Sequence, residues 1–191
     1  MDIVVEQRKR RNRIHPHKFT LWVAIGSIVM MFAGLTSAYI VKSNQAGWHS
    51  VEMPRVFWYS TATLLLSSLT MQIALRSFKQ REMSTYRLLM GATFALGVTF
   101  VILQFIGFQQ LWNSGIQFKG SSGGGQFLYV IAGLHAVHVL GGIIALMVMS
   151  VKAFFGQTKL YGSVPVELMA TYWHFVDLLW IYLLIFFMWM G

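Results

Sequence analysis

The sequence has no cysteine, and only 11% of its 191 residues are charged. The absence of cysteine excludes disulfides, thiolate-bound clusters and thiol catalysis. The scarcity of charge, beside a hydrophobic fraction of 56%, excludes an ordinary water-soluble domain, because too few charges are left to cover its surface. We therefore expect a polytopic membrane protein.

Five apolar windows are each long enough to cross a hydrocarbon core of about 30 Å as a helix. They lack the alternation of an outer-membrane strand, and a helix satisfies its own backbone hydrogen bonds in lipid. We predict an all-α bundle of five transmembrane helices over residues 19–191, after a basic, disordered tail at 1–18. The windows are 19–41, 56–75, 88–111, 127–150 and 170–190.

The positions of Lys and Arg predict the orientation of the bundle. Twelve of the fifteen lie in the amino-terminal tail and in the loops after the second and fourth windows. By the positive-inside rule the amino terminus is expected inside and, after five crossings, the carboxyl terminus outside. These residues flank membrane segments, so anionic lipid is a nearer partner for the net charge of +9 than nucleic acid.

Ionisable residues interrupt the last two windows. His135 and His138 lie three residues apart in the fourth, and His174 and Asp177 repeat this spacing in the fifth. Because an ionised group at the bilayer centre costs about 2.5–3.5 kcal/mol, such residues normally face protein or a water-filled cavity. Each pair shares one helical face, so side-by-side packing would bring four polar groups together.

Three interpretations of this predicted polar cluster remain open. Histidines and a carboxylate could hold a divalent metal ion within a bundle, or two histidines could ligate haem from opposite helices. The same residues could instead carry protons. The functional alternatives are thus a small metal-binding membrane oxidoreductase and a proton-coupled transporter. In the third and favoured interpretation they exchange hydrogen bonds that fix the register of the helices, with no catalytic residue and no metal in the chain.

Aromatic and small residues indicate where helices pack. Trp173 and Trp180 lie seven residues apart, on nearly the same face of the last helix. Gly133 and Gly142 would let backbones approach closely. We expect lipid or subunit packing there, a flexible link at 120–125, and almost no other polar side chain able to line a pathway.

Two motifs resemble subunit III of the haem–copper terminal oxidases, the cytochrome c oxidase subunit III family. The run Tyr172–Trp173–His174–Phe175–Val176–Asp177, followed by Trp180, is similar to the family's Tyr-Trp-His-Phe-Val-Asp-x-x-Trp signature. The run from Gly133 to Val139, followed by Gly142, resembles its Gly-x-His-x-x-His-Val pattern. Weaker similarity covers Met31 to Tyr39 and Leu103–Gln104, and five helices match the shorter bacterial form.

The resemblance implies an accessory subunit in a bacterial inner (plasma) membrane, part of a respiratory complex that reduces oxygen and pumps protons. Its implied partners are oxidase subunits I and II, membrane lipids and, in some cases, a larger respiratory supercomplex. Haem and copper would lie in the catalytic partner, with bound phospholipid and no redox cofactor in this chain. Tyr39 joins the expected packing residues.

Two residues depart from the family pattern. Ile28 and Gly107 stand where many relatives have a membrane glutamate. A direct role in proton supply that depends on those carboxylates is therefore not implied for this chain.

Overall fold

The computed structural model describes residues 16–44, 53–115, 123–155 and 162–190, and every regular element in these ranges is a helix. The prediction of an all-helical fold is thus confirmed. Of the tail expected at 1–18, residues 1–15 lie outside the described residues, whereas residues 16–18 form the first turn of the first helix and are not disordered. The helices are α2 (Pro16–Ser43), α3 (Val56–Lys79), α4 (Met83–Asn113), α5 (Gly123–Phe155) and α6 (Val164–Met190).

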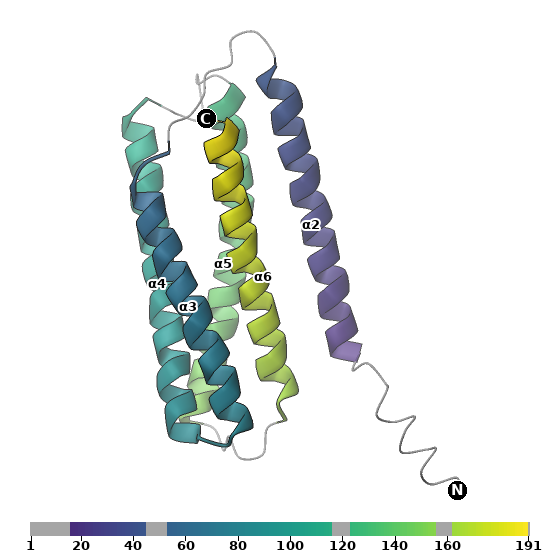
Figure 1. Ribbon diagram of the computed structural model, residues 1–191, viewed down its shortest axis with the longest axis vertical. Helices are drawn as coiled ribbons and strands as arrows, with labels where there is room; N and C mark the ends of the chain where they lie inside the picture. The colour runs from purple at the N-terminus through teal and green to yellow at the C-terminus, as the bar shows by residue number, and fades with distance from the viewer. Residues whose placement is uncertain (1–15, 45–52, 116–122, 156–161, 191) are drawn as a thin grey trace, which may run out of the picture.

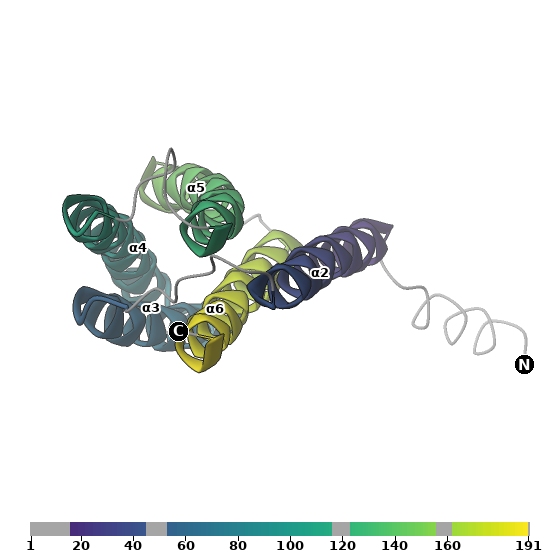
Figure 2. The same ribbon diagram turned by 90° about the horizontal axis from the view of Figure 1, so that it is seen from above.

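The helices run up and down beside one another (Figures 1 and 2). Helix α6 packs against α2, α3 and α5, helix α5 packs against α2, α4 and α6, and α3 packs against α4. Among α2, α4, α5 and α6, the apolar window of α6 is the most deeply buried, at 50%, and that of α2 the least, at 17%. Seen from above, α2 therefore lies at one edge (Figure 2).

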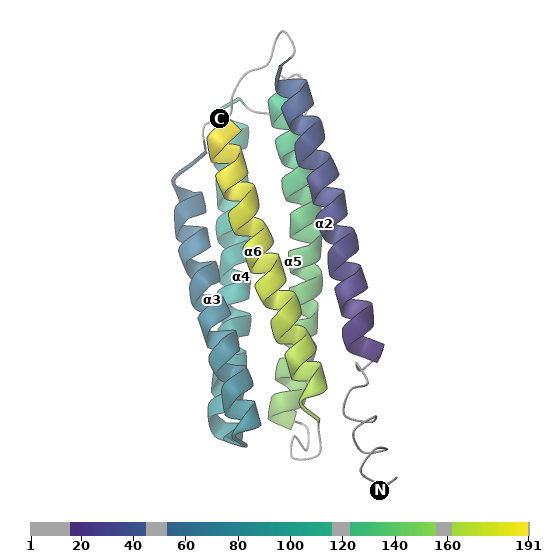
Figure 3. The same cartoon turned by 45° about the vertical axis from the view of Figure 1, so that its right-hand side comes forward.

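Helices α3 and α4 form an antiparallel hairpin (Figure 3). Most of their buried residues recur at spacings of three and four, as in a coiled-coil seam. The connecting turn has Arg81 at φ 64°, and the backbone N–H of Glu82 donates to the carbonyl of Ser77 at 3.0 Å. This closes the end of α3 in the manner of a Schellman motif. The buried residues are Phe57, Ser60, Leu64, Ser67, Met71, Ala74, Ser77 and Phe78 in α3, and Tyr86, Met90, Thr93, Gly97, Phe100, Gly107 and Leu111 in α4.

Among the described helices, α2, α4, α5 and α6 are long and apolar enough to cross a membrane. The window at 56–75 belongs to α3, which is not one of them, so the prediction of five membrane-spanning helices is not confirmed. Hydroxyl side chains lower the hydropathy of α3, and several of them, including Ser60 and Ser67, are buried against neighbouring helices. The bundle therefore covers Ser60, Ser67 and Ser77 of α3, whereas Arg76 and Lys79 are exposed.

The helices extend beyond the apolar windows. A flexible link is expected from the sequence at 120–125, but α5 starts at Gly123. The three glycines at 123–125 therefore form its first turn and are not part of a link. The start of α2 and the end of α6 lie at opposite ends of the bundle (Figure 1). This agrees with an odd number of passes, whereas the inside amino terminus stays a prediction.

Candidate functional site

The family-like motif of α6 faces α3 through two indole hydrogen bonds. Trp173 donates from Nε1 to Oγ of Ser67 at 2.8 Å, and Trp180 donates from Nε1 to Oγ1 of Thr61 at 3.1 Å. Both indoles are buried, at 0% and 3% exposed. Because lipid offers no partner for an N–H group, these two bonds fix both the rotation and the register of α6 against α3.

His174 adds a third connection to the same helix. Its Nδ1 lies 2.6 Å from Oγ of Ser68, and its Nε2 lies 3.2 Å from Oε1 of Gln72. Both ring nitrogens are thus engaged by α3. We call Thr61, Ser67, Ser68 and Gln72 the α3 polar stripe.

Asp177 lies between Trp173 and Trp180 on α6 and is 3% exposed. Neither of its carboxylate oxygens has a hydrogen-bond partner among the described residues. The nearby hydroxyl of Ser68 is engaged by the His174 ring.

His135 in α5 contacts the Trp180 indole of α6. Its ring stacks on the Trp180 indole with centroids 5.3 Å apart and planes 26° apart, and it meets the edge of Phe32 at 6.5 Å. It is 2% exposed, and neither ring nitrogen has a partner in the described part of the chain. One stacked and one edge-on aromatic contact thus surround the His135 ring.

His138 lies three residues further along α5 and shares the contact with Phe32 of α2. Its Nδ1 lies 2.7 Å from the carbonyl oxygen of Leu134, one turn earlier in α5, and its ring lies 5.9 Å from that of Phe32 in α2. The hydroxyl of Tyr172 donates to the His138 carbonyl at 2.9 Å. His138 thus contributes to the packing of α5 against both α2 and α6.

The four predicted polar residues do not share one set of contacts. His174 contacts α3, whereas the rings of His135 and His138 both contact Phe32 of α2. Within residues 16–44, 53–115, 123–155 and 162–190, no three His, Asp or Glu side chains are grouped so that they could hold a metal ion. The arrangement can hold helices in register, and the interaction role of these residues stays a prediction.

Glycines admit the Trp173 indole between α4 and α5. A Cβ on Gly97 would lie 3.0 Å from Cη2 of Trp173, and one on Gly142 would lie 3.0 Å from Cζ3. Both distances are too short for an unshifted carbon atom. Gly142 is therefore a point of close packing within the chain, whereas a Cβ on Gly133 would meet nothing within 4 Å.

Tyr39 forms an aromatic cluster near the carboxyl-terminal end of α2. Its ring centroid lies 5.3 Å from that of Phe186, 5.8 Å from that of Phe187 and 6.3 Å from that of Phe127. One turn earlier, Oγ1 of Thr36 lies 3.1 Å from the Tyr182 hydroxyl. These contacts attach this end of α2 to α5 and α6.

The structure explains one departure from the family pattern. A Cβ on Gly107 would lie 3.0 Å from the ring of Phe57, which is itself 2% exposed. A glutamate side chain has no room there unless Phe57 moves. Ile28, at the other position, is half-buried against the apolar core.

The α3 polar stripe was missed in the sequence, whereas the expectation that almost no polar side chain outside the histidine segments lines a pathway stays a prediction. Ser67 and Ser68 follow Ser60 and Thr61 by seven residues, a spacing that places each pair on one helical face. Gln104 extends the network, since its Nε2 donates to Oγ of Ser60 at 3.1 Å. That repeat of hydroxyls in an apolar segment was the available signal.

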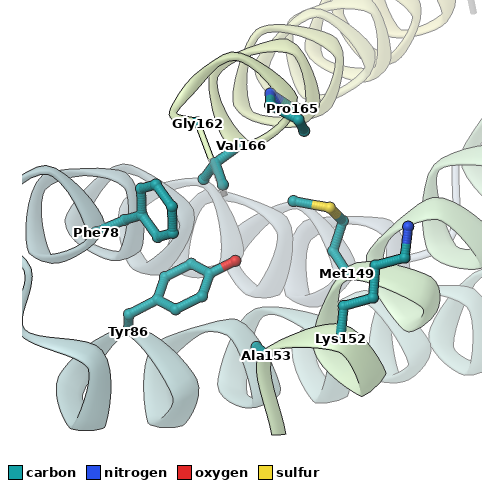
Figure 4. Close-up of a pocket in the computed structure, with 8 residues that line it drawn as sticks. All are labelled: Phe78, Tyr86, Met149, Lys152, Ala153, Gly162, Pro165 and Val166. Atoms are coloured by element: carbon teal, nitrogen blue, oxygen red, sulfur yellow. The ribbon is translucent and has the colours of Figure 1, made fainter. Parts of the chain in front are cut away.

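A small apolar cavity of about 100 Å³ lies near the ends of α3, α4, α5 and α6. The rings of Phe78 and Tyr86 face Met149 and Val166 across it, and the Lys152 amino group lies toward its edge (Figure 4). Its lining is almost entirely hydrocarbon, so it offers no set of convergent polar groups.

The sequence model of the family described as "Cytochrome c oxidase subunit III" matches residues 18–191. The chain belongs to this family. The match covers all five helices except the first two residues of α2, so the motifs of α5 and α6 lie within it. Members of the family are subunits of terminal oxidase complexes, and this chain is a multi-pass protein of a bacterial plasma membrane.

Several curated proteins are similar to the chain along most of its length. The "Probable cytochrome c oxidase subunit 3" of Mycobacterium tuberculosis (strain ATCC 25618 / H37Rv) is 30% identical over 181 residues, which cover 89% of each chain. The "Cytochrome c oxidase subunit 3" of Bacillus sp. (strain PS3) is 29% identical over 167 residues, covering 85% of this chain and 80% of the relative. The "Cytochrome bo(3) ubiquinol oxidase subunit 3" of Buchnera aphidicola subsp. Baizongia pistaciae (strain Bp) is 28% identical over 169 residues, 85% of each chain.

Proposed function

We propose that this chain is the accessory subunit III of a proton-pumping respiratory haem–copper oxidase and packs on the catalytic subunit I, in a complex that also contains subunit II. The observation that carries the proposal is the family match over residues 18–191. The geometry supports it, because the residues of the α6 motif are engaged in contacts between helices. Trp173, His174 and Trp180 all bond to α3, as expected of a scaffold.

Haem and copper belong, in this proposal, to the catalytic partner, where electron transfer and oxygen reduction take place. Bound phospholipid is the ligand assigned to this chain. The names of the relatives include both a cytochrome c oxidase and a ubiquinol oxidase, so the proposal covers either electron donor.

Support of proton uptake is proposed to be indirect. Gly107 and Ile28 supply no carboxylate at the two positions where relatives carry glutamate. The Phe57 ring occupies the space beside Gly107, so a carboxylate cannot be added there without repacking. The chain is therefore expected to help proton uptake by keeping the catalytic subunit intact during turnover.

Removal of the chain tests this role. Oxidase prepared without it should keep its haem spectrum and its initial rate of oxygen reduction, but should lose activity faster during sustained turnover. If oxidase lacking the chain were equally durable, the accessory role would be wrong. Elemental analysis adds a check on the alternative of a metal-binding oxidoreductase: stoichiometric metal bound to this chain alone, and lost in His138→Ala, would favour that alternative.

A further inference from the structure

One carboxylate joins three helices at the end of the bundle where α2 begins. The Nζ atom of Lys18 in α2 lies 2.7 Å from Oε2 of Glu167 in α6, and Nζ of Lys79 in α3 lies 3.1 Å from Oε1 of the same side chain. Each oxygen thus holds a different ammonium group. The three side chains together carry a net charge of +1.

A hollow of about 300 Å³ opens beside these ion pairs. Its walls include Trp22, Leu75 and Leu168, whereas Lys18, Lys79 and Glu167 supply polar atoms. A water molecule occupies about 30 Å³ of liquid, so the hollow has room for a phosphate group with part of its hydration shell. Its lining combines charge with hydrocarbon.

The donor capacity of the two lysines is not exhausted by Glu167. An ammonium group has three N–H donors, and the two ion pairs use one on each lysine. The lysine side chains are 41% and 53% exposed, against 22% for Glu167. The carboxylate therefore lies deeper than the ammonium groups and holds them where a second anion can reach them, although it also weakens the attraction for that anion.

The location of the hollow selects the anion. Trp22, one turn after Lys18, is 61% exposed, and exposed tryptophan near the end of a membrane helix is typical of the headgroup level. Basic pockets between transmembrane helices bind phospholipid headgroups. The walls formed by Leu75 and Leu168 can accept the first part of an acyl chain.

We propose that Lys18 and Lys79, held together by Glu167, bind the phosphate of one anionic phospholipid in the hollow between α2, α3 and α6. The net charge of +1 complements the single negative charge of phosphatidylglycerol. This deepens the lipid binding in the proposed function and rests on it. The ion pair between Lys18 and Glu167 holds the start of α2 against α6. The lipid would fill the space beside this contact.

Native mass spectrometry of the intact oxidase complex, loaded with phosphatidylglycerol, tests this site. Loss of one lysine from a basic membrane surface should weaken binding about fivefold, so Lys79→Gln and Lys18→Gln should each reduce occupancy of one lipid. The matched control is Arg76→Gln, which removes the same charge from exposed α3 surface one turn away. Lys79→Arg should retain binding.

Equal lipid retention by wild type and Lys79→Gln would overturn the site, as would equal losses in Lys79→Gln and Arg76→Gln. A second experiment starts from complexes that contain only phosphatidylcholine and adds either phosphatidylglycerol or inorganic phosphate. It measures how far each addition protects Lys18 and Lys79 from an amine-modifying reagent, and phosphatidylglycerol should protect them more. Protection by added inorganic phosphate equal to that by phosphatidylglycerol would assign the site to free phosphate and overturn the lipid proposal. The haem content of the same samples reports the proposed function separately, because a haem-free wild-type preparation would contradict that function and not the site.

Discussion

The packing of Trp173 against two glycines predicts a strong coupling between α4 and α6. In Gly97→Ala the new methyl group would lie 3.0 Å from Cη2 and 3.2 Å from Cζ2 of the indole. Trp173 is fully buried and fixed by its bond to Ser67, so the ring cannot retreat freely. Overpacking of this kind costs about 1–3 kcal/mol. We expect Gly97→Ala to lower the free energy of unfolding by that amount relative to Gly26→Ala, which shares the gain in helix propensity.

A double substitution tests the stated cause. Phenylalanine lacks the outer indole atoms that meet position 97, but Trp173→Phe also loses the bond to Ser67 and leaves a small cavity, together about 1–2 kcal/mol. If the two effects were independent, the double variant would lose about 2–5 kcal/mol. We expect it to lose only about as much as Trp173→Phe alone, because the clash is gone.

The assay is titration with sodium dodecyl sulfate in mixed micelles, followed by far-UV circular dichroism, since tryptophan fluorescence would change with the substitution itself. Gly26→Ala is the matched control, because a Cβ there meets nothing within 4 Å. It should be neutral or more stable by up to about 1 kcal/mol, through helix propensity alone. Additive losses in the double variant would refute the packing argument, and so would an equal loss in Gly26→Ala.

Three further predictions concern single contacts. Thr61→Val and Ser67→Ala remove the acceptors of Trp180 and Trp173 and should each cost about 0.6–1.7 kcal/mol in the same titration. The control is Thr63→Val, because the exposed hydroxyl of Thr63 bonds to the carbonyl of Tyr59 in its own helix. This control should cost less, and equal costs would contradict the role of the α3 polar stripe. Glu167→Gln should release the start of α2 from α6 and lower the free energy of unfolding by less than about 1 kcal/mol per ion pair, and by less still in high salt. Spin-label distances between α2 and α6 should lengthen near Lys18 and stay fixed near Thr36. An unchanged distance near Lys18 would count against this role of the ion pairs. Gly107→Glu should prevent assembly of the subunit in membranes, whereas adding Phe57→Ala should restore part of it; full assembly of the single variant would show that Phe57 does not block the position.

The sequence was sufficient to predict the all-helical fold and the residues that mark the family. Long apolar windows require helices in lipid, and the paired motifs around His135 and His174 are specific in their order. The prediction of five membrane-spanning helices rested on the length of each apolar window and did not weigh the hydroxyl side chains within it. Helix α3 departs from this because it carries more hydroxyl side chains. The buried hydroxyls of Ser60 and Ser67 accept hydrogen bonds from Gln104 of α4 and Trp173 of α6, and these contacts are not visible in the composition of α3.

The partners of the candidate site residues were beyond a reading of spacing. An i, i+3 pair predicts a shared face but not which helix that face meets. His174 turns to α3 and away from His135, since the rotation of α6 is set by the two indole bonds. Glu167 shows the same limit: its position near the start of α6 is visible in the sequence, whereas its ion pairs with Lys18 and Lys79 depend on three helix ends that are far apart along the chain.

The haem-to-chain ratio after affinity purification from native membranes in mild detergent tests the central claim most directly. A tag on this chain should recover oxidase subunits I and II, with haem absorbance in constant proportion to the chain through gel filtration. Recovery of a stable, haem-free monomer without an oxidase partner would contradict the assignment.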